Sequence, residues 1–242
     1  MVSRIVVAFA LVTGALLVGC APDSPKEYGR QLYSDPTLST AGSNVFSCVT
    51  CHEVVPNPTT LHPGYTLFDT AVRPSWWGGE VDTLFDAVNQ CLTNFMRSNQ
   101  LTPDDPKGRA LLVYLQSVAP DATAPALPLT IVQNIVDIPS GDPAQGKAIW
   151  DSACGYCHGA PHTGVGRLDS TVSLVPDDSI MAHGVDPKTG ARPVVIEKTR
   201  HGKFFNVGGN MAFYSVEKLS DAQLGQVLGY LEQFGLPPYS GM

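Results

Sequence analysis

The sequence predicts an all-α protein built from two similar units that follow one another and are joined by a proline-rich linker. Three observations lead to this fold class. Each unit opens with a glycine four residues before a large aromatic residue, contains one five-residue cysteine–histidine motif, and closes with a helix whose apolar residues recur at helical spacing. We expect the first unit over residues 21–118, the linker over 119–139 and the second unit over 140–242.

The closing helix of the second unit has the clearest signals. Ser220 is a suitable N-cap, and Gln223 three residues later completes a capping box. An apolar stripe follows, formed by Leu224, Val227, Leu228, Leu231 and Phe234. In the first unit the same spacing predicts one helix from about residue 80 to 97 and a closing helix over residues 104–118.

The linker is rich in proline, which makes a semi-rigid spacer. Within it, residues 129–138 are apolar and rich in β-branched side chains. They could form a strand, or an extended strap packed over both units. A rigid connection would hold the two units close to one another.

The chemistry lies in two copies of the pattern C-x-x-C-H, namely Cys48-Val49-Thr50-Cys51-His52 and Cys154-Gly155-Tyr156-Cys157-His158. This spacing is the attachment site of a c-type haem. The thiols form thioether bonds with the vinyl groups of one haem, and the histidine reaches the iron as its proximal ligand. The sequence therefore predicts two covalently bound haem c groups, with His52 and His158 as iron ligands.

Two alternatives use the cysteines differently. A four-cysteine zinc site would leave unexplained why a histidine follows each cysteine pair. The two remaining cysteines, Cys20 and Cys91, could form a disulfide, although neither has an obvious structural partner.

Each opening helix places its glycine and aromatic residue on one face, Gly29 with Tyr33 and Gly146 with Trp150. The order of opening helix, C-x-x-C-H motif and apolar closing helix resembles the cytochrome c fold. The resemblance covers nearly all of the chain after residue 20 and implies two tandem cytochrome c-like domains. It also implies that the first and last helices of each domain cross at the glycine.

The second axial ligand of each iron comes from elsewhere in the chain. In the second unit Met211 is the best candidate, because it lies in a glycine-bearing loop shortly before the closing helix. Small cytochromes c carry their distal methionine in that place. A thioether ligand stabilises ferrous iron and raises the reduction potential. Met181 and His183 are the alternatives.

In the first unit the candidates are Cys91, Met96 and His62. Cys91 belongs to an apolar stripe and faces inward, as an inert buried cysteine also would. Residues 89–96 resemble a segment of the diheme cytochromes of the thiosulfate dehydrogenase family, including a methionine five residues past the cysteine. The resemblance implies ligation by His52 and Cys91, and a thiolate would lower that haem's potential below its partner's.

The first twenty residues form a targeting segment rather than part of the fold. Arg4 precedes an apolar run over residues 5–18 that is too short for a spanning helix. The segment ends at Cys20 in a sequence that resembles the bacterial lipoprotein lipobox, which implies cleavage before Cys20 and a lipid on its thiol. An ordinary signal peptide cut near Ala21 is the alternative.

Lipidation implies a protein anchored in the bacterial cell envelope and facing the periplasm, which agrees with the attachment of c-type haem outside the cytoplasm. Ala21 after the lipidated cysteine favours the outer membrane over the inner one. Acyl chains in one leaflet would tether a soluble body to that surface.

Composition restricts the partners. Without Arg4, 14 basic residues stand against 22 acidic ones, a net charge of −8 before haem propionates. An acidic surface argues against nucleic acid and is compatible with a basic redox partner, although plain solubility explains the charge equally well.

Together these features predict a diheme c-type cytochrome that passes single electrons between redox protein partners in the periplasm or membrane. The alternative is an enzyme similar to thiosulfate dehydrogenase, acting at the first haem with Cys91 as its catalytic residue. A diheme peroxidase would need an open iron position, which Met211 argues against in the second unit.

Overall fold

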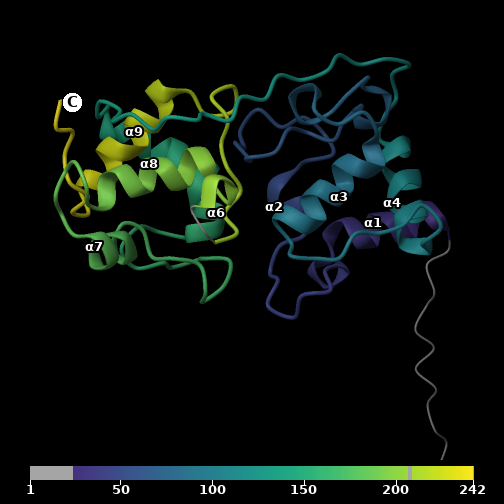
Figure 1. Ribbon diagram of the computed structural model, residues 1–242, viewed down its shortest axis with the longest axis horizontal. Coiled ribbons are helices and arrows are strands. Elements are labelled where there is room, and N and C mark those ends of the chain that lie inside the picture. Colours follow the sequence, from purple (N-terminus) through teal and green to yellow (C-terminus); the bar gives the residue numbers. More distant parts are fainter. Residues whose placement is uncertain (1–23, 207–208, 242) are drawn as a thin grey trace, which may run out of the picture.

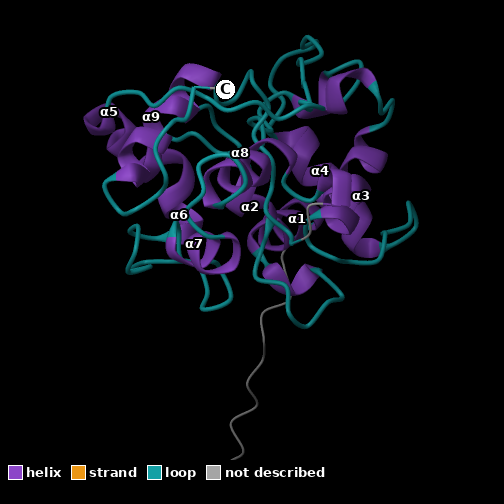
Figure 2. Ribbon diagram, turned by 60° about the vertical axis from the view of Figure 1, so that its left-hand side comes forward, coloured by secondary structure: helices purple, strands orange, loops and turns teal. Residues whose placement is uncertain are grey.

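The computed structural model describes residues 24–206 and 209–241, so Cys20 and the targeting segment lie outside the described residues. The only strand-like pairing in this part of the chain is an isolated bridge between Trp76 and Val81 (Figure 2). The α-helices are α1 Pro25–Ser34, α2 Cys48–Cys51, α3 Leu84–Asn94, α4 Pro106–Ser117, α5 Pro143–Ile149, α6 Gly155–His158, α7 Asp177–His183, α8 Ala191–His201 and α9 Asp221–Glu232. The predicted all-α fold class is confirmed. Within the described ranges, no helix has both the length and the apolar character needed to span a bilayer.

In each unit the first and last helices pack against one another, α1 on α4 and α5 on α9 (Figures 1 and 2). A Cβ atom added to Gly29 would lie 2.0 Å from the carbonyl oxygen of Ala110, and one added to Gly146 would lie 1.9 Å from that of Gln226. These distances are shorter than any van der Waals contact, so only glycine permits either crossing. The crossing implied by the resemblance to the cytochrome c fold is confirmed in both units.

The aromatic residue beside each glycine anchors the end of the nearby motif. The Tyr33 hydroxyl donates to the backbone carbonyl of His52. In the second unit the Trp150 indole N–H donates to the carbonyl of Gly159 at 2.9 Å. Each ring also packs on a tyrosine of the closing helix, with ring centroids 5.6 Å apart in the first unit and 6.5 Å in the second. The two units therefore repeat one arrangement with different side chains.

Helix α9 begins where the sequence predicts, and α4 begins at Pro106, two residues later than predicted. At α9 the Ser220 hydroxyl accepts the N–H of Gln223 at 3.3 Å, and the Gln223 side chain accepts the N–H of Ser220 at 2.9 Å, so the predicted capping box is confirmed. In the first unit Asp105 caps α4 by accepting the N–H of Lys107 at 2.8 Å. Both caps satisfy backbone donors that a helix leaves free at its first turn.

Helix α3 is shorter than the predicted helix over residues 80–97. It starts at Leu84 because the Thr83 hydroxyl caps it, accepting the N–H of Asp86 at 3.1 Å. The preceding residues form a turn instead, closed by the bridge between Trp76 and Val81.

The segment between α4 and α5 is an extended strap that contacts both units. The Tyr65 hydroxyl of the first unit donates to the carbonyl of Pro128 at 2.7 Å. Thr130 donates its N–H and hydroxyl to Glu217 of the second unit, at 3.1 and 2.5 Å. Of the two predicted forms of this segment, the strap is confirmed.

The end of the strap is tied to the second unit by Arg192 of α8, whose side chain is fully buried. Its guanidinium donates to Asp137 and to Glu232 of α9, each at 2.7 Å, and to the carbonyl of Ile138 at 2.6 Å. Ile138 itself lies in the apolar core of the second unit. The last part of the strap therefore packs as part of that unit.

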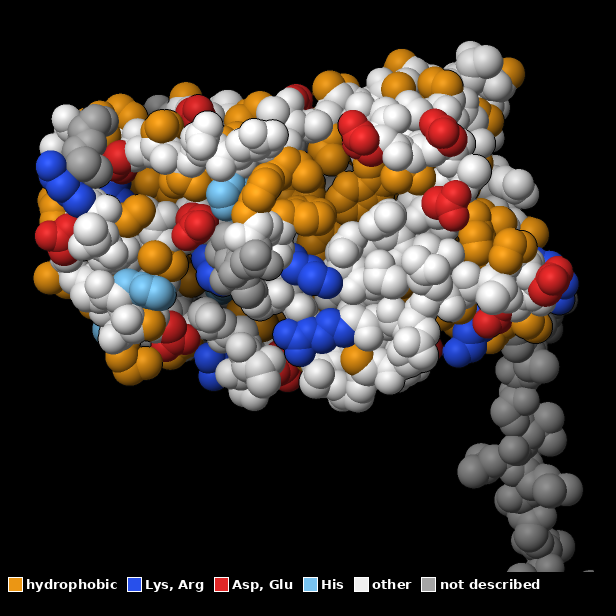
Figure 3. All heavy atoms as spheres, in the orientation of Figure 1, with side chains coloured by type: hydrophobic (Ala, Val, Ile, Leu, Met, Phe, Trp, Pro, Cys, Tyr) orange, Lys and Arg blue, Asp and Glu red, His pale blue; other side chains and the backbone are white. Residues whose placement is uncertain are grey.

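The two units meet along an apolar junction. Figure 3 shows hydrophobic side chains gathered between the two halves of the molecule. Trp77 of the first unit contacts Phe204 and Phe213 of the second, with ring centroids 6.2 and 6.4 Å apart. The Lys203 ammonium donates across the junction to the carbonyl of Thr93 in α3 at 3.2 Å. These contacts hold the units in one relative position.

Candidate haem-attachment sites

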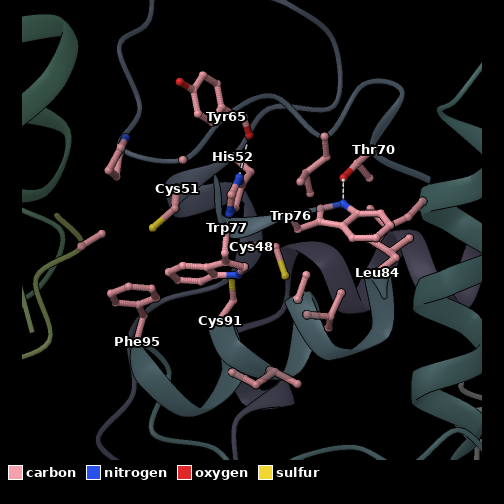
Figure 4. A pocket seen from close by; sticks show the side chains of 18 of the residues that line it. Cys48, Cys51, His52, Tyr65, Thr70, Trp76, Trp77, Leu84, Cys91 and Phe95 are labelled. Carbon is pink, nitrogen blue, oxygen red and sulfur yellow. Dashed lines mark hydrogen bonds between the residues drawn. The ribbon is translucent and has the colours of Figure 1, made fainter. Parts of the chain in front are cut away.

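The first C-x-x-C-H motif opens into a large apolar cavity in the first unit (Figure 4). The cavity holds about 1370 Å³ free of protein atoms, including the part open to solvent. Cys48, Cys51 and His52 line it, and so does Cys91 of α3. Figure 4 shows His52 on one side and Cys91 on the other, with the indole of Trp77 between them in this view. The predicted inward orientation of Cys91 is confirmed.

The walls of this cavity come from the first unit, from the strap and from one short segment of the second unit. Leu127 and Leu129 of the strap line it, and so does Phe213 of the second unit. Trp77 stacks on Phe95 of the first unit, with ring planes 5° apart and centroids at 6.2 Å. Trp77 also has φ of 53°, a left-handed conformation that a bulky residue rarely adopts. The first site is therefore completed only when the second unit and the strap pack against it.

His52 is held in the orientation of a metal ligand. Its Nδ1 lies 2.7 Å from the carbonyl oxygen of Tyr65, so Nδ1–H donates there and Nε2 is left available. A Cβ atom at Gly64 would lie 2.3 Å from the ring, which shows how closely the backbone clamps the imidazole. Burial lowers the pKa of His52, which keeps the ring neutral at neutral pH. A neutral imidazole with one nitrogen bonded to a carbonyl is the usual form of a metal-binding histidine.

His158 of the second motif has the same arrangement on a different framework. Its Nδ1 lies 2.9 Å from the carbonyl oxygen of Ser173, again leaving Nε2 available, and burial lowers its pKa. The Trp150 ring lies beside it, with centroids 6.1 Å apart. The motif begins at the last residue of a π-helical turn over Trp150–Cys154.

The five described cysteines are free thiols in apolar surroundings. Burial raises the pKa of Cys48 and Cys157 to about 11 and that of Cys91 and Cys154 to about 12, with nearby thiol groups adding to the shift at Cys91 and Cys154. The pKa of Cys51 also rises, through burial and then through Cys157, Cys91 and Cys48. Burial is therefore the main cause of the raised pKa at all five thiols.

The positions of the described cysteines do not support a four-cysteine zinc site. Within residues 24–206 and 209–241, no three His, Cys, Asp or Glu side chains come together as a set of metal ligands. Cys48 and Cys51 instead border an apolar cavity with room for a large planar group, as a haem requires.

The three candidate second ligands of the first site occupy different places. Cys91 and Met96 both line the cavity, and Met96 is 4% exposed. His62 is engaged elsewhere, with Nδ1 3.1 Å from the carbonyl oxygen of Thr50 and its ring against Tyr156. The structure thus brings two of the three candidates to the first site.

In the second unit, Met211 is half-buried on the segment between α8 and α9. Residues 207–208 just before it lie outside the described residues. The alternatives lie on α7 facing solvent, where Met181 is 82% exposed and His183 is also exposed. Ligation by Met211 stays a prediction.

Comparison with known proteins agrees with this chemistry for part of the chain. Residues 141–231, less than half of the chain, match the family described as cytochrome C oxidase, cbb3-type, subunit III. No curated protein matches the sequence. Among solved structures, thiosulfate dehydrogenase (TsdBA) from Marichromatium purpuratum in its "as isolated" form aligns with a TM-score of 0.41 and 15% identity. The alignment covers 86% of this chain and 45% of that one, so this chain spans less than half of that structure's length.

The fold and the second motif define the class: residues 141–231 carry a cytochrome c domain. Such a domain binds haem c covalently and serves electron transfer, in a carrier or in a redox enzyme. Domains of this class typically work outside the cytoplasm and exchange electrons with other redox proteins.

Proposed function

We propose that the chain is a diheme c-type cytochrome that passes single electrons between redox protein partners. The observation that carries this proposal is the matched placement of His52 and His158. In both motifs Nδ1 is bonded to a backbone carbonyl, at 2.7 and 2.9 Å, and Nε2 is left for iron. When bound, each haem supplies a one-electron iron couple. The chain's part is to orient the imidazoles, hold the macrocycle by two thioethers and surround it with apolar walls.

Ligand identity would give the two sites different potentials. Cys91 lines the first cavity, and its pKa of about 12 means that iron binding must release the thiol proton. A thiolate lowers the potential of haem iron, whereas the thioether of Met211 raises it. We infer that an electron on the molecule rests in the second unit.

Haem content tests the proposal directly. The protein is produced in a host with c-type haem attachment, and its intact mass is measured. We expect two haems on the wild type, one after Cys48→Ala with Cys51→Ala, and one after Cys154→Ala with Cys157→Ala. A wild-type chain carrying a single haem would refute the diheme proposal, and its location would show which motif fails.

Ligation is tested by spectroscopy of the oxidised protein. Cys91→Ala should abolish a low-spin thiolate signal in electron paramagnetic resonance, whereas Met96→Leu, which alters the other cavity-lining candidate, should leave it intact. Met211→Leu should remove the methionine–iron charge-transfer band, with the exposed Met181→Leu as its control. A signal unchanged by Cys91→Ala, or a band unchanged by Met211→Leu, would show that the ligand lies elsewhere.

A second candidate function is favoured by the position of Cys91 opposite His52 (Figure 4). The resemblance of residues 89–96 to the thiosulfate dehydrogenase family implies that two thiosulfates are joined to tetrathionate there, releasing two electrons. Thiosulfate with ferricyanide as acceptor is the assay. If the wild type turns over thiosulfate, Cys91→Ala does not and Met96→Leu still does, the protein is an enzyme acting at the first site. If the wild type shows no turnover, electron transfer between partners is the remaining function.

We also propose that the protein is anchored in the cell envelope by a lipid on Cys20, facing the periplasm. The lipobox-like sequence supports this. Labelled palmitate should enter the wild type and not Cys20→Ser, and the label should fractionate with the outer membrane. If neither the wild type nor Cys20→Ser carried the label, and the two mature chains had the same length, the segment would be an ordinary signal peptide.

A further inference from the structure

The two motifs face one another where the units meet. Helix α2, which contains Cys48 and Cys51, and helix α6, which contains Cys157, lie on either side of the junction (Figures 1 and 2). The loop after the first motif reaches across it, because the N–H of Leu61 donates to the carbonyl of Ser152 at 3.1 Å. Ser152 lies two residues before Cys154, so a backbone hydrogen bond joins the two attachment segments.

Tyr214 reinforces this connection from a buried position. Its hydroxyl lies 3.0 Å from the carbonyl oxygen of Leu61 in the first unit and 2.6 Å from that of Ala153 in the second. The residue is 3% exposed. One hydroxyl proton is thus shared between two carbonyls, one in the loop after the first motif and one directly before the second motif.

His62 makes a second connection between the motifs themselves. Its Nδ1 lies 3.1 Å from the carbonyl oxygen of Thr50, inside the first motif. Its ring meets the ring of Tyr156, inside the second motif, edge-on with centroids 5.4 Å apart. The middle residues of the two motifs are therefore in contact through one histidine.

Thiols of both motifs influence Tyr214. Burial raises the pKa of Tyr214 well above its ordinary value, and Cys154, Cys157 and Cys51 add to the shift, so Tyr214 keeps its proton at neutral pH. Haems bound at the two motifs would be attached through the motif sulfurs, so the contacts of Tyr214 and His62 would fix the two attachment points relative to one another.

We propose that Tyr214 and His62 are positioning residues that hold the two attachment sites at one fixed separation, and that an electron crosses between the sites at this junction. This inference rests on the proposed diheme function. With haem held at both motifs, one electron would pass from the iron of one site to the iron of the other, and the redox partners would supply and remove it. No bond forms or breaks, and no proton leaves Tyr214.

The test uses the holoprotein with Tyr214→Phe, His62→Ala and the double variant. Tyr114→Phe is the control, since it changes a buried tyrosine of α4 away from the junction. Two readouts are needed besides haem content. Electron paramagnetic resonance of the oxidised protein reports dipolar broadening between two ferric haems, and flash photoreduction reports how fast the electron redistributes between them.

We expect the wild type and Tyr114→Phe to show dipolar broadening and fast redistribution. Tyr214→Phe and His62→Ala should retain both haems, lose broadening and slow redistribution, with the largest loss in the double variant. Should Tyr214→Phe not fold, His62→Ala alone decides the question, because its side chain is only partly buried. Unchanged broadening and rates in His62→Ala and Tyr214→Phe would overturn the inference. A wild type with fewer than two haems would instead overturn the diheme proposal, which the haem content shows separately.

Discussion

The two attachment sites share their proximal geometry and differ in what surrounds them. Both histidines donate Nδ1–H to a carbonyl, and both motifs end beneath an aromatic side chain that hydrogen-bonds to the backbone. The first site, however, is walled by the strap and by Phe213 of the other unit. The contacts of His158 come from its own unit, through Ser173 and Trp150.

This difference shows which part of the site can be repeated and which cannot. The crossing of first and last helices and the orientation of the histidine are local to a unit, so both units have them. The closure of the first cavity depends on the other unit, so substitutions in the strap or at the junction should alter the first site. Substitutions at a helix crossing should affect only the unit that contains the crossing.

The largest effect is expected at Arg192, which ties the strap to the second unit. Arg192→Met would leave the carboxylates of Asp137 and Glu232 without their buried partner, and should lower the free energy of unfolding by about 3–5 kcal/mol. Urea unfolding measures it. Arg30→Met, which removes an exposed ion pair with Glu27, is the control and should change nothing measurable. Equal stabilities for both variants would mean that the strap is not held by this arginine.

The next largest effect is expected at the two helix crossings. Gly29→Ala and Gly146→Ala each push a methyl group into a facing backbone carbonyl, and should destabilise the protein by about 1–3 kcal/mol or more. Hydrogen exchange should show faster opening of α1 and α4 for the first variant and of α5 and α9 for the second. Gly42→Ala, where an added Cβ meets open space, should behave as wild type. Equal exchange in both units would contradict the independence of the crossings.

A smaller effect is expected where the aromatic residues anchor the motifs. Tyr33→Phe leaves the His52 carbonyl without its donor, and Trp150→Phe does the same at Gly159. Each should lower stability by about 1–2 kcal/mol, since a buried acceptor loses its partner. The spectra of the two haems should shift one at a time, each with its own variant. Both spectra shifting with either variant would show that the anchors act across the junction.

The smallest effect is expected from pH at the strap. Burial alone would raise the pKa of Glu217, but hydrogen bonds, first from Thr130, outweigh it and lower the pKa to about 2. The stabilisation is therefore complete above the unfolded pKa of about 4.3 and is lost as the pH falls toward about 2. Because Glu217 is largely exposed, it contributes under about 1 kcal/mol. In acid unfolding, Glu217→Gln should make the free energy of unfolding depend less steeply on pH over this range. If the pH dependence did not change, other carboxylates would be responsible for it.

Sequence reasoning succeeded where the signal lies within a few residues. The C-x-x-C-H spacing, the pairs Gly29–Tyr33 and Gly146–Trp150, and the capping box at α9 are local patterns, and each element based on them is present. Helix α8 was beyond this reasoning, because its buried side chains include Arg192, Thr199 and Arg200 rather than an apolar stripe. Their burial depends on partners far away in the chain.

The hydrogen-bond partners of His52 and His158 could not be predicted from the sequence either. Tyr65 and Ser173 act through backbone carbonyls, which every residue possesses, so no residue type marks them. Tyr214 is an ordinary aromatic residue in the sequence, and only the packing of the units places its hydroxyl between Leu61 and Ala153.

The amino-acid sequence by itself determined the two C-x-x-C-H motifs and the repeated helical unit, because motif spacing and helical periodicity act over a few residues. Only the tertiary structure decided that the strap and second unit close the first cavity, that Cys91 lies across it from His52, and that the two motifs touch through His62. Those arrangements arise from burial and hydrogen bonding between segments up to about 150 residues apart, which no local pattern encodes.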